Sequence, residues 1–269
     1  MVELNTKYKI GKRRFGIINW IGFISLYKKE TLRFLIVSGQ TILGPVLTGI
    51  LFLIVLSIAW GEDRGEVLGL PFIEFLAPGL ISMQVIQQSF SHSSSSLLGG
   101  KMMGSIIDLI GSPLSAGEVT FAIILASVTR AFIICVTSIF CFNFFVEISI
   151  LSYYYFTIYL IFSSFLMGAL GFIAGIWADR YDNMATITNF IIIPLSFLSG
   201  TFYSIERLPN ILKEMSFYNP FFHMIDGLRF SMIGISDGST TFGLIYLLSF
   251  NLVLWWVAYY LYKIGYKIK

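Results

Sequence analysis

Long stretches without a single charged residue constrain this chain more than any other feature of its sequence. Three such stretches cover residues 34–61, 75–100 and 148–178. Because about 20 apolar residues suffice to cross the hydrocarbon core of a bilayer, each stretch is long enough to form a transmembrane helix. Charged residues make up only 12% of the chain, whereas soluble domains carry about 25%, so we interpret the chain as a polytopic membrane protein.

Three further apolar segments bring the predicted number of transmembrane helices to six. They lie within 119–146, at about 184–203 and within 241–262. A helix satisfies its own backbone hydrogen bonds inside lipid, so six such spans predict an all-α fold. We therefore expect an all-α polytopic membrane protein that forms a single transmembrane domain over residues 1–269.

The distribution of basic residues predicts how these helices are oriented. Most of the 18 Lys and Arg residues lie in 1–33, in 101–118, in 179–183 and in the C-terminal tail. Loops that remain in the cytoplasm carry an excess of Lys and Arg, and an even number of spans places both termini on one side. Both termini are therefore predicted to be cytoplasmic, with 101–118 on the same side and 199–229 outside.

Two segments that do not span are predicted to lie at the cytoplasmic membrane surface. Residues 15–33 interleave apolar and charged side chains, which is typical of an interfacial amphipathic helix, although an ordinary surface helix is the alternative. Residues 1–33 are thus predicted to form a cytoplasmic tail and an interfacial helix. Residues 101–118 are too short and too polar to span, and they predict a short amphipathic helix ended by Pro113.

Polar residues inside two of the predicted spans are unusual for membrane depth. The second span carries three Gln residues and a run of Ser between 84 and 96. These side chains either face a bundle interior or cavity, or their small size permits tight helix packing. Arg130 lies within the third span, where a charge costs at least about 2.5–3.5 kcal/mol. We expect it to face the interior, with Ser, Gln or backbone carbonyl partners, or to reach the edge of the membrane.

A proline-bracketed segment separates the last two predicted spans. Pro209 and Pro220 each fix φ and disfavour helix at the preceding residue. The residues between them mix apolar and charged side chains, which suits short, half-inserted helices at a membrane face. We predict an external re-entrant hairpin over residues 203–240.

This hairpin carries a pattern that resembles the signature of the type 2 ABC transporter permeases. The pattern comprises a small-residue exit from the fifth span, Leu208-Pro209, Pro220-Phe221-x-His223 and a following Arg229. The resemblance implies the membrane subunit of an exporter driven by a separate ABC ATPase, which holds the ATP and magnesium. It also implies a homodimer, or a dimer with a close paralogue, in a bacterial inner membrane, and an amphiphilic, lipid-like or glycan substrate moved outward.

The same resemblance assigns roles to the two cytoplasmic segments. It places an elbow helix at 15–33 and a coupling helix within 101–118, which docks into a groove on the ATPase. The residues expected to carry coupling are Met103, Ile106, Ile107, Asp108, Leu109, Ile110 and Pro113. The residues expected to shape the external hairpin are Pro209, Pro220, His223 and Arg229.

No sequence motif predicts a chemical reaction for this chain. It contains neither the G-x-x-x-x-G-K-[ST] phosphate loop nor the H-E-x-x-H zinc motif. His92 and His223 are predicted to lie on opposite sides of the membrane, which argues against a shared metal site. We therefore expect a transport permease rather than an enzyme, with no cofactor, metal site or nucleic-acid partner of its own.

A polytopic lipid-modifying membrane enzyme is the alternative function. Such an enzyme needs paired carboxylates or His near one interface, to hold a metal or to act as acid and base. The nearest candidates are the acidic residues at 62–66 and at 179–182, and neither group has a His beside it. Both read more readily as solvated turns. Lipid turnover by the purified chain without any ATPase would reverse this ranking.

Overall fold

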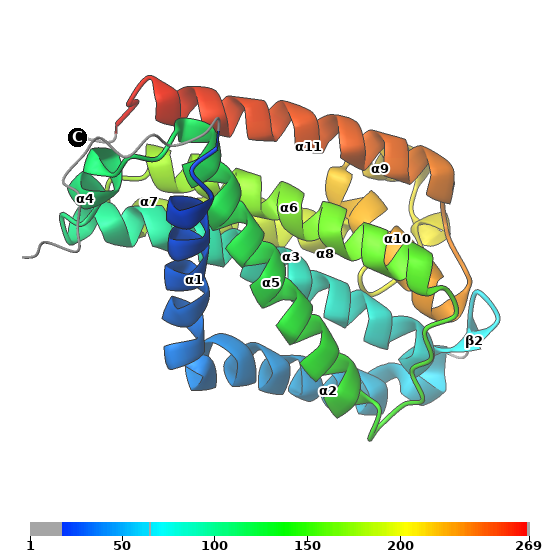
Figure 1. Ribbon diagram of the computed structural model, residues 1–269. Helices are drawn as coiled ribbons and strands as arrows, with labels where there is room; N and C mark the ends of the chain where they lie inside the picture. The colour runs from blue at the N-terminus through cyan, green and yellow to red at the C-terminus, as the bar shows by residue number, and fades with distance from the viewer. Residues whose placement is uncertain (1–17, 65, 268–269) are drawn as a thin grey trace, which may run out of the picture.

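The chain is mostly helical, as the sequence predicted. The computed structural model describes residues 18–64 and 66–267, so the predicted tail over 1–17 lies outside the described residues. Figure 1 shows the helices gathered around α3. In chain order the α-helices are α1 (Trp20–Ile36), α2 (Gly44–Arg64), α3 (Phe72–Met102), α4 (Ile106–Gly111), α5 (Ala116–Phe142), α6 (Tyr153–Trp177), α7 (Tyr181–Ile187), α8 (Ile193–Leu198), α9 (Asn210–Tyr218), α10 (Pro220–Ile233) and α11 (Thr240–Lys263).

One small hairpin departs from the all-α prediction. Strands β1 (Glu66–Val67) and β2 (Leu70–Pro71) pair antiparallel between α2 and α3. Leu68 and Gly69, which join them, have φ values of 55° and 78°. A two-residue loop with both φ values positive matches the right-handed twist of the strands, so it closes a tight hairpin where only a polar turn was expected.

Four helical segments among the described residues are long and apolar enough to cross a membrane. They are Gly39–Ala59, Ala116–Phe142, Tyr153–Trp177 and Thr240–Lys263. They correspond to the first, third, fourth and sixth predicted spans, although the first begins five residues later than its uncharged stretch. The second and fifth predicted spans are also helical, but hydropathy alone does not identify them as spans.

The second and fifth predicted spans differ from the other four for different physical reasons. Helix α3 is 31 residues long, but its Gln and Ser residues lower its mean hydropathy, and most of its side chains are buried by other helices. A helix surrounded by protein needs no apolar surface toward lipid. The fifth predicted span is divided into α7, a π-helical turn η2 (Thr188–Ile192) and α8, and it ends at Leu198 rather than near 203.

Two π-helical turns interrupt helices immediately before prolines. Turn η1 (Gly39–Leu43) precedes Pro45, and η2 precedes Pro194. A proline has no N–H to donate, and its ring displaces the carbonyl four residues earlier, so a widened turn accommodates it. The chain also turns a corner at Val37, between the nearly upright α1 and the transverse α2 in Figure 1. Phe34 therefore belongs to α1, and the first candidate span begins at Gly39, inside the uncharged stretch 34–61.

Helix α6 packs closely against α3 through glycines. A Cβ atom placed on Gly171 would lie 2.3 Å from the carbonyl oxygen of Phe90, and one on Gly175 would lie 2.9 Å from the carbonyl oxygen of Ser94. Small residues at such positions allow helix backbones to approach each other, which is how membrane helices gain packing contacts. Gly171 and Gly175, four positions apart on one face of α6, therefore permit the close contact with α3.

Candidate functional site

Helix α4 presents an apolar surface that no other described residue covers. The exposed fractions of Met103, Ile107 and Ile110 are 83%, 70% and 54%, respectively. Asp108 is also exposed and forms no ion pair with a described residue. Pro113 follows the helix and is exposed as well. This surface contains five of the seven residues that were expected to carry coupling.

The other two expected coupling residues face inward and hold α4 in place. Ile106 is only 4% exposed and belongs to a buried cluster with Leu97 and Val119, and Leu109 packs against the same cluster. A helix this short is not stable by itself, so this anchoring fixes its position. The inner face of α4 therefore packs directly against α3 and α5.

A polar clamp joins the start of α1 to the segment after α4. The backbone N–H of Asn19 donates to the Glu118 carboxylate at 2.6 Å, and its side-chain amide donates to the carbonyl of Pro113 at 3.0 Å. Glu118 also accepts from the backbone N–H of Ser115, which caps α5 in return. The Ser-x-x-Glu pattern is a capping-box signature that the sequence analysis did not use.

Two lysines form hydrogen bonds with the C-terminal end of α6, at the end of the molecule that carries α4. The Lys101 amine donates to the carbonyls of Ile176 and Ala178, each at 2.7 Å. Lys267 donates to Asp179 at 3.0 Å, and this hydrogen bond is the main cause that lowers the pKa of Asp179 from its ordinary value. Lys cations at the last carbonyls of a helix complement its dipole. Lys101 therefore links the last turn of α3, which precedes α4, to the end of α6.

Polar side chains follow one face of α3 at four-residue intervals. Gln84 accepts from Ser138 at 2.6 Å, Gln88 accepts from Arg130, and Ser96 donates to Glu30 at 2.7 Å. His92, between them, is fully buried and places its ring edge-to-face with Phe34. These residues pack against α1, α2 and α5. On this face of α3, the polar side chains therefore face the interior of the helix bundle, which was the first of the two alternatives.

Arg130 lies inside the bundle, with partners of the kind expected. It is 6% exposed and donates to the Gln88 side chain and to the Thr41 carbonyl, the latter at 3.4 Å. In a regular helix the Thr41 carbonyl would accept from residue 45, but Pro45 has no N–H. Within the π-helical turn η1, Arg130 thus adds a side-chain donor to the Thr41 carbonyl.

Two neighbouring cavities that share Gln87 lie along α3, one toward α2 and one toward the fifth predicted span, and together they are called the groove. Gln87 lines a cavity of about 230 Å³ against Pro45 and Phe52 on one side. It also lines a cavity of about 360 Å³, which includes Ser91 and Asn189, on the other side. The groove thus combines polar groups, on α3 and on η2, with apolar groups such as Pro45 and Phe52.

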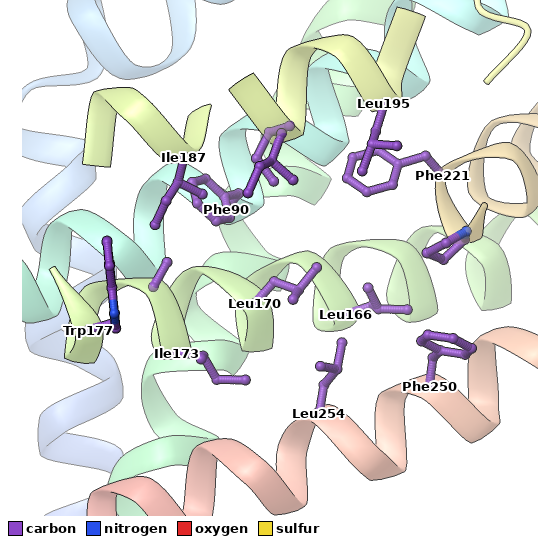
Figure 2. Close-up of a pocket in the computed structure, with 14 residues that line it drawn as sticks. Phe90, Leu166, Leu170, Ile173, Trp177, Ile187, Leu195, Phe221, Phe250 and Leu254 are labelled. Carbon is purple, nitrogen blue, oxygen red and sulfur yellow. The ribbon is translucent and has the colours of Figure 1, made fainter. Parts of the chain in front are cut away.

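An apolar pocket of about 390 Å³ lies on the opposite side of the fifth predicted span. Figure 2 shows Phe90, Leu170 and Leu254 converging on it from α3, α6 and α11. Phe90 and Ile192 line both this pocket and the polar groove. The η2 turn therefore separates a polar space from an apolar one.

The four expected hairpin residues lie at the ends of helices or in buried contacts between helices. Pro209 precedes α9, and Pro220 is the first residue of α10. His223 lies 2.8 Å from the carbonyl of Phe217 through Nε2. Arg229 is 1% exposed, donates to the Gly200 carbonyl at 2.5 Å and lies 3.8 Å from Asp237. These contacts hold α10 against the end of α8.

Comparison with known proteins places the chain in a family. The family model described as "ABC-2 type transporter" matches residues 22–233. The inner membrane transport permease YadH of Escherichia coli K12 is 29% identical over 240 residues, which cover 88% of this chain and 94% of that protein. Nodulation protein J of Neorhizobium galegae is 23% identical over 227 residues, covering 81% of this chain and 83% of that protein. The resemblance predicted from the hairpin is confirmed, and the chain belongs to the ABC-2 type transporter family, as the membrane subunit of an ABC transporter.

Proposed function

We propose that this chain is the permease subunit of an ATP-driven exporter and that a separate ABC ATPase energises it. The proposed substrate is amphiphilic, lipid-like or glycan, and it moves outward across a bacterial inner membrane. The observation that carries this proposal is the exposed apolar face of α4, because an uncovered cluster of large apolar side chains marks an interaction surface. ATP and magnesium would bind to the partner.

The anchoring of α4 supports its assignment as the coupling helix. Ile106 and Leu109 pack into the bundle, while Ile107 and Ile110 project away from it. A groove on the ATPase that receives Ile107 would push α4, and the clamp around Glu118 would carry that movement to α1 and α5. The exposed Asp108 would pair with a basic group at the rim of that groove.

The groove along α3 supports a shared transport pathway. It is amphiphilic, because Gln87, Ser91 and Asn189 contribute polar groups while Pro45 and Phe52 contribute apolar ones. We propose that a second copy, or a close paralogue, faces this groove and completes the pathway. The amphiphilic character of the groove suits a substrate with polar and apolar parts.

The six-span topology with cytoplasmic termini is also part of the proposal. The start of α1 contacts Pro113, and Lys267 contacts Asp179, so both ends of the described chain lie at the end that carries α4. The α1 helix would serve as the interfacial elbow, and α9 with α10 as the external re-entrant hairpin. A reporter fused to either terminus should read cytoplasmic, and a tag after Glu206 should be accessible from outside.

Charge substitutions on α4 test the proposal. Ile107→Glu and Asp108→Lys should leave the permease inserted but weaken its co-purification with its ABC ATPase partner. An unpaired charge buried at such a contact costs about 2–5 kcal/mol. Ile211→Glu, on the opposite end of the molecule, is the matched control, because Ile211 is 76% exposed. Full association and transport in both α4 variants would place the ATPase contact elsewhere and contradict the proposal.

A further inference from the structure

A separate pocket lies where α1, α3, α4 and α7 meet. Its volume is about 360 Å³, and polar groups from all four elements or their flanks line it: Lys29, Arg33, Ser95, Ser105 and Tyr181. Leu97, Ile106 and Leu109 form its apolar part. Figure 1 shows α1, α4 and α7 at the same end of the molecule, where the proposed cytoplasmic surface lies.

The charges around this pocket leave one cation uncompensated. Glu30 is 3% exposed, and its carboxylate accepts from Arg33 at 3.0 Å and from Ser96 at 2.7 Å. The charges of Glu30 and Arg33 therefore cancel each other locally. Among the described residues, no acidic side chain pairs with the Lys29 amine. A positive charge thus lines a pocket that also contains apolar groups and hydroxyls.

Two hydroxyl groups add hydrogen-bonding capacity to the same space. Ser105 and Tyr181 line the pocket, and the Ser105 hydroxyl makes no capping hydrogen bond to α4. Hydroxyl and ammonium donors are suited to phosphate oxygens, since hydrogen bonds to an ionised acceptor are about twice as strong as neutral ones. The remaining apolar side chains suit the glycerol and the first carbons of an acyl chain.

We propose that this pocket binds the phosphodiester headgroup of an anionic phospholipid from the cytoplasmic leaflet. Basic pockets between membrane helices on the cytoplasmic side bind anionic headgroups, and each basic residue near such a surface contributes favourably. The inference rests on the proposed function only for the placement of this end at the cytoplasmic surface. A lipid bound here contacts α1 and the base of α4 together, so it joins the elbow to the coupling helix.

The test measures lipid binding to the full chain in detergent by native mass spectrometry. Dioleoylphosphatidylglycerol should bind more tightly than dioleoylphosphatidylcholine, and Lys29→Gln should reduce that preference about fivefold. Lys28→Gln is the matched control, because Lys28 is the adjacent exposed lysine and does not line the pocket. Tyr181→Phe should reduce the preference by a smaller factor while leaving the fold unchanged.

Three results would overturn the inference. Equal affinity for the two lipids would remove the need for an anion site. An equal loss in the Lys28 and Lys29 variants would indicate a diffuse basic surface instead of a pocket. Displacement of phosphatidylglycerol by glycerol phosphate or inorganic phosphate at equal concentration would assign the site to a soluble phosphate. None of these measurements involves the ATPase, so a failure of the proposed export function would be seen separately, in the α4 variants.

Discussion

The contact between Gly171 on α6 and the backbone of α3 yields a quantitative prediction. An alanine Cβ at position 171 would lie 2.3 Å from the Phe90 carbonyl oxygen and 3.0 Å from its carbon. Favourable contact begins at roughly 3.5 Å, so the two helices must separate by roughly 1 Å. All the obstructing atoms belong to the backbone, so rotation of a side chain cannot relieve the contact.

The cost of Gly171→Ala follows from two opposing terms. Overpacking a tight contact costs about 1–3 kcal/mol, while alanine gains about 1 kcal/mol over glycine in helix propensity. The expected net loss is about 0–2 kcal/mol, centred on about 1 kcal/mol, which lowers the Tm by about 2–4 °C at that centre and by no more than about 8 °C. The shift also displaces the groove along α3, so transport should fall with stability.

The effect is measured by heating the detergent-solubilised protein and monitoring its unfolding by size-exclusion chromatography. Gly117→Ala is the control, because the nearest atoms to its Cβ belong to the Tyr259 ring at 3.9 Å. That variant should keep or slightly raise the Tm. Equal Tm values for the two variants would refute the reasoning that α3 and α6 depend on this glycine for their packing.

Three further predictions concern polar contacts. Arg130→Leu removes the side chain that donates to the Thr41 carbonyl, at a cost of about 1–3 kcal/mol. Substrate-stimulated ATP hydrolysis should therefore fall in this variant, whereas Arg130→Lys should retain part of it. A Leu variant equal to wild type would show that Arg130 has no functional role. Arg229→Met breaks a buried pair with Asp237 and should cost about 3–5 kcal/mol, seen as loss of monodisperse protein, while the exposed Arg207→Met should not. The hydrogen bond from Lys267 is the main cause of the lowered pKa of Asp179, so their contact stabilises the fold at pH values above the ordinary Asp pKa of about 3.9. This stabilisation disappears as the pH falls through the lowered pKa. Hydrogen exchange near residue 267 should therefore rise on acidification, and Asp179→Asn should abolish that pH dependence.

Hydropathy predicted the helical class, because segments exposed to lipid must be apolar. Motif spacing predicted the family, because the positions of the prolines can be read from the sequence. They did not predict the corner at Val37, since an uncharged stretch reports membrane depth but not where a helix ends. The proline at position 45 did mark a nearby break, which the structure resolves as a π-helical turn.

The partners of polar residues were harder to predict, because periodicity gives a face but not the helix opposite it. Gln88 pairs with Arg130 between α3 and α5 and also lines the cavity against Pro45, whereas its neighbour Gln87 lines that cavity and the one that includes Asn189. The polar residues of α3 therefore serve two faces. The four-residue spacing of the first face is visible in the sequence, but only the fold identifies its partners.

In the predicted coupling segment, sequence reasoning grouped residues that the structure separates. Ile106 and Leu109 lie three positions apart on the inward face of α4, a helical spacing that predicts a common side. The role of the outward face as the ATPase contact stays a prediction. The Glu118 clamp was missed altogether, because the contribution of Asn19 comes from a distant part of the chain.

Site-specific photocrosslinking from α4 to the ATPase tests the central claim most directly. A photoreactive amino acid at position 107 or 110, in the permease co-expressed with the neighbouring ABC ATPase, should form a crosslink that depends on an assembled complex. The same residue at the exposed position 211, on the opposite end, should form none. Crosslinks from 107 and 110 alone are the predicted result; a complex that co-purifies intact but crosslinks from neither position would contradict the account.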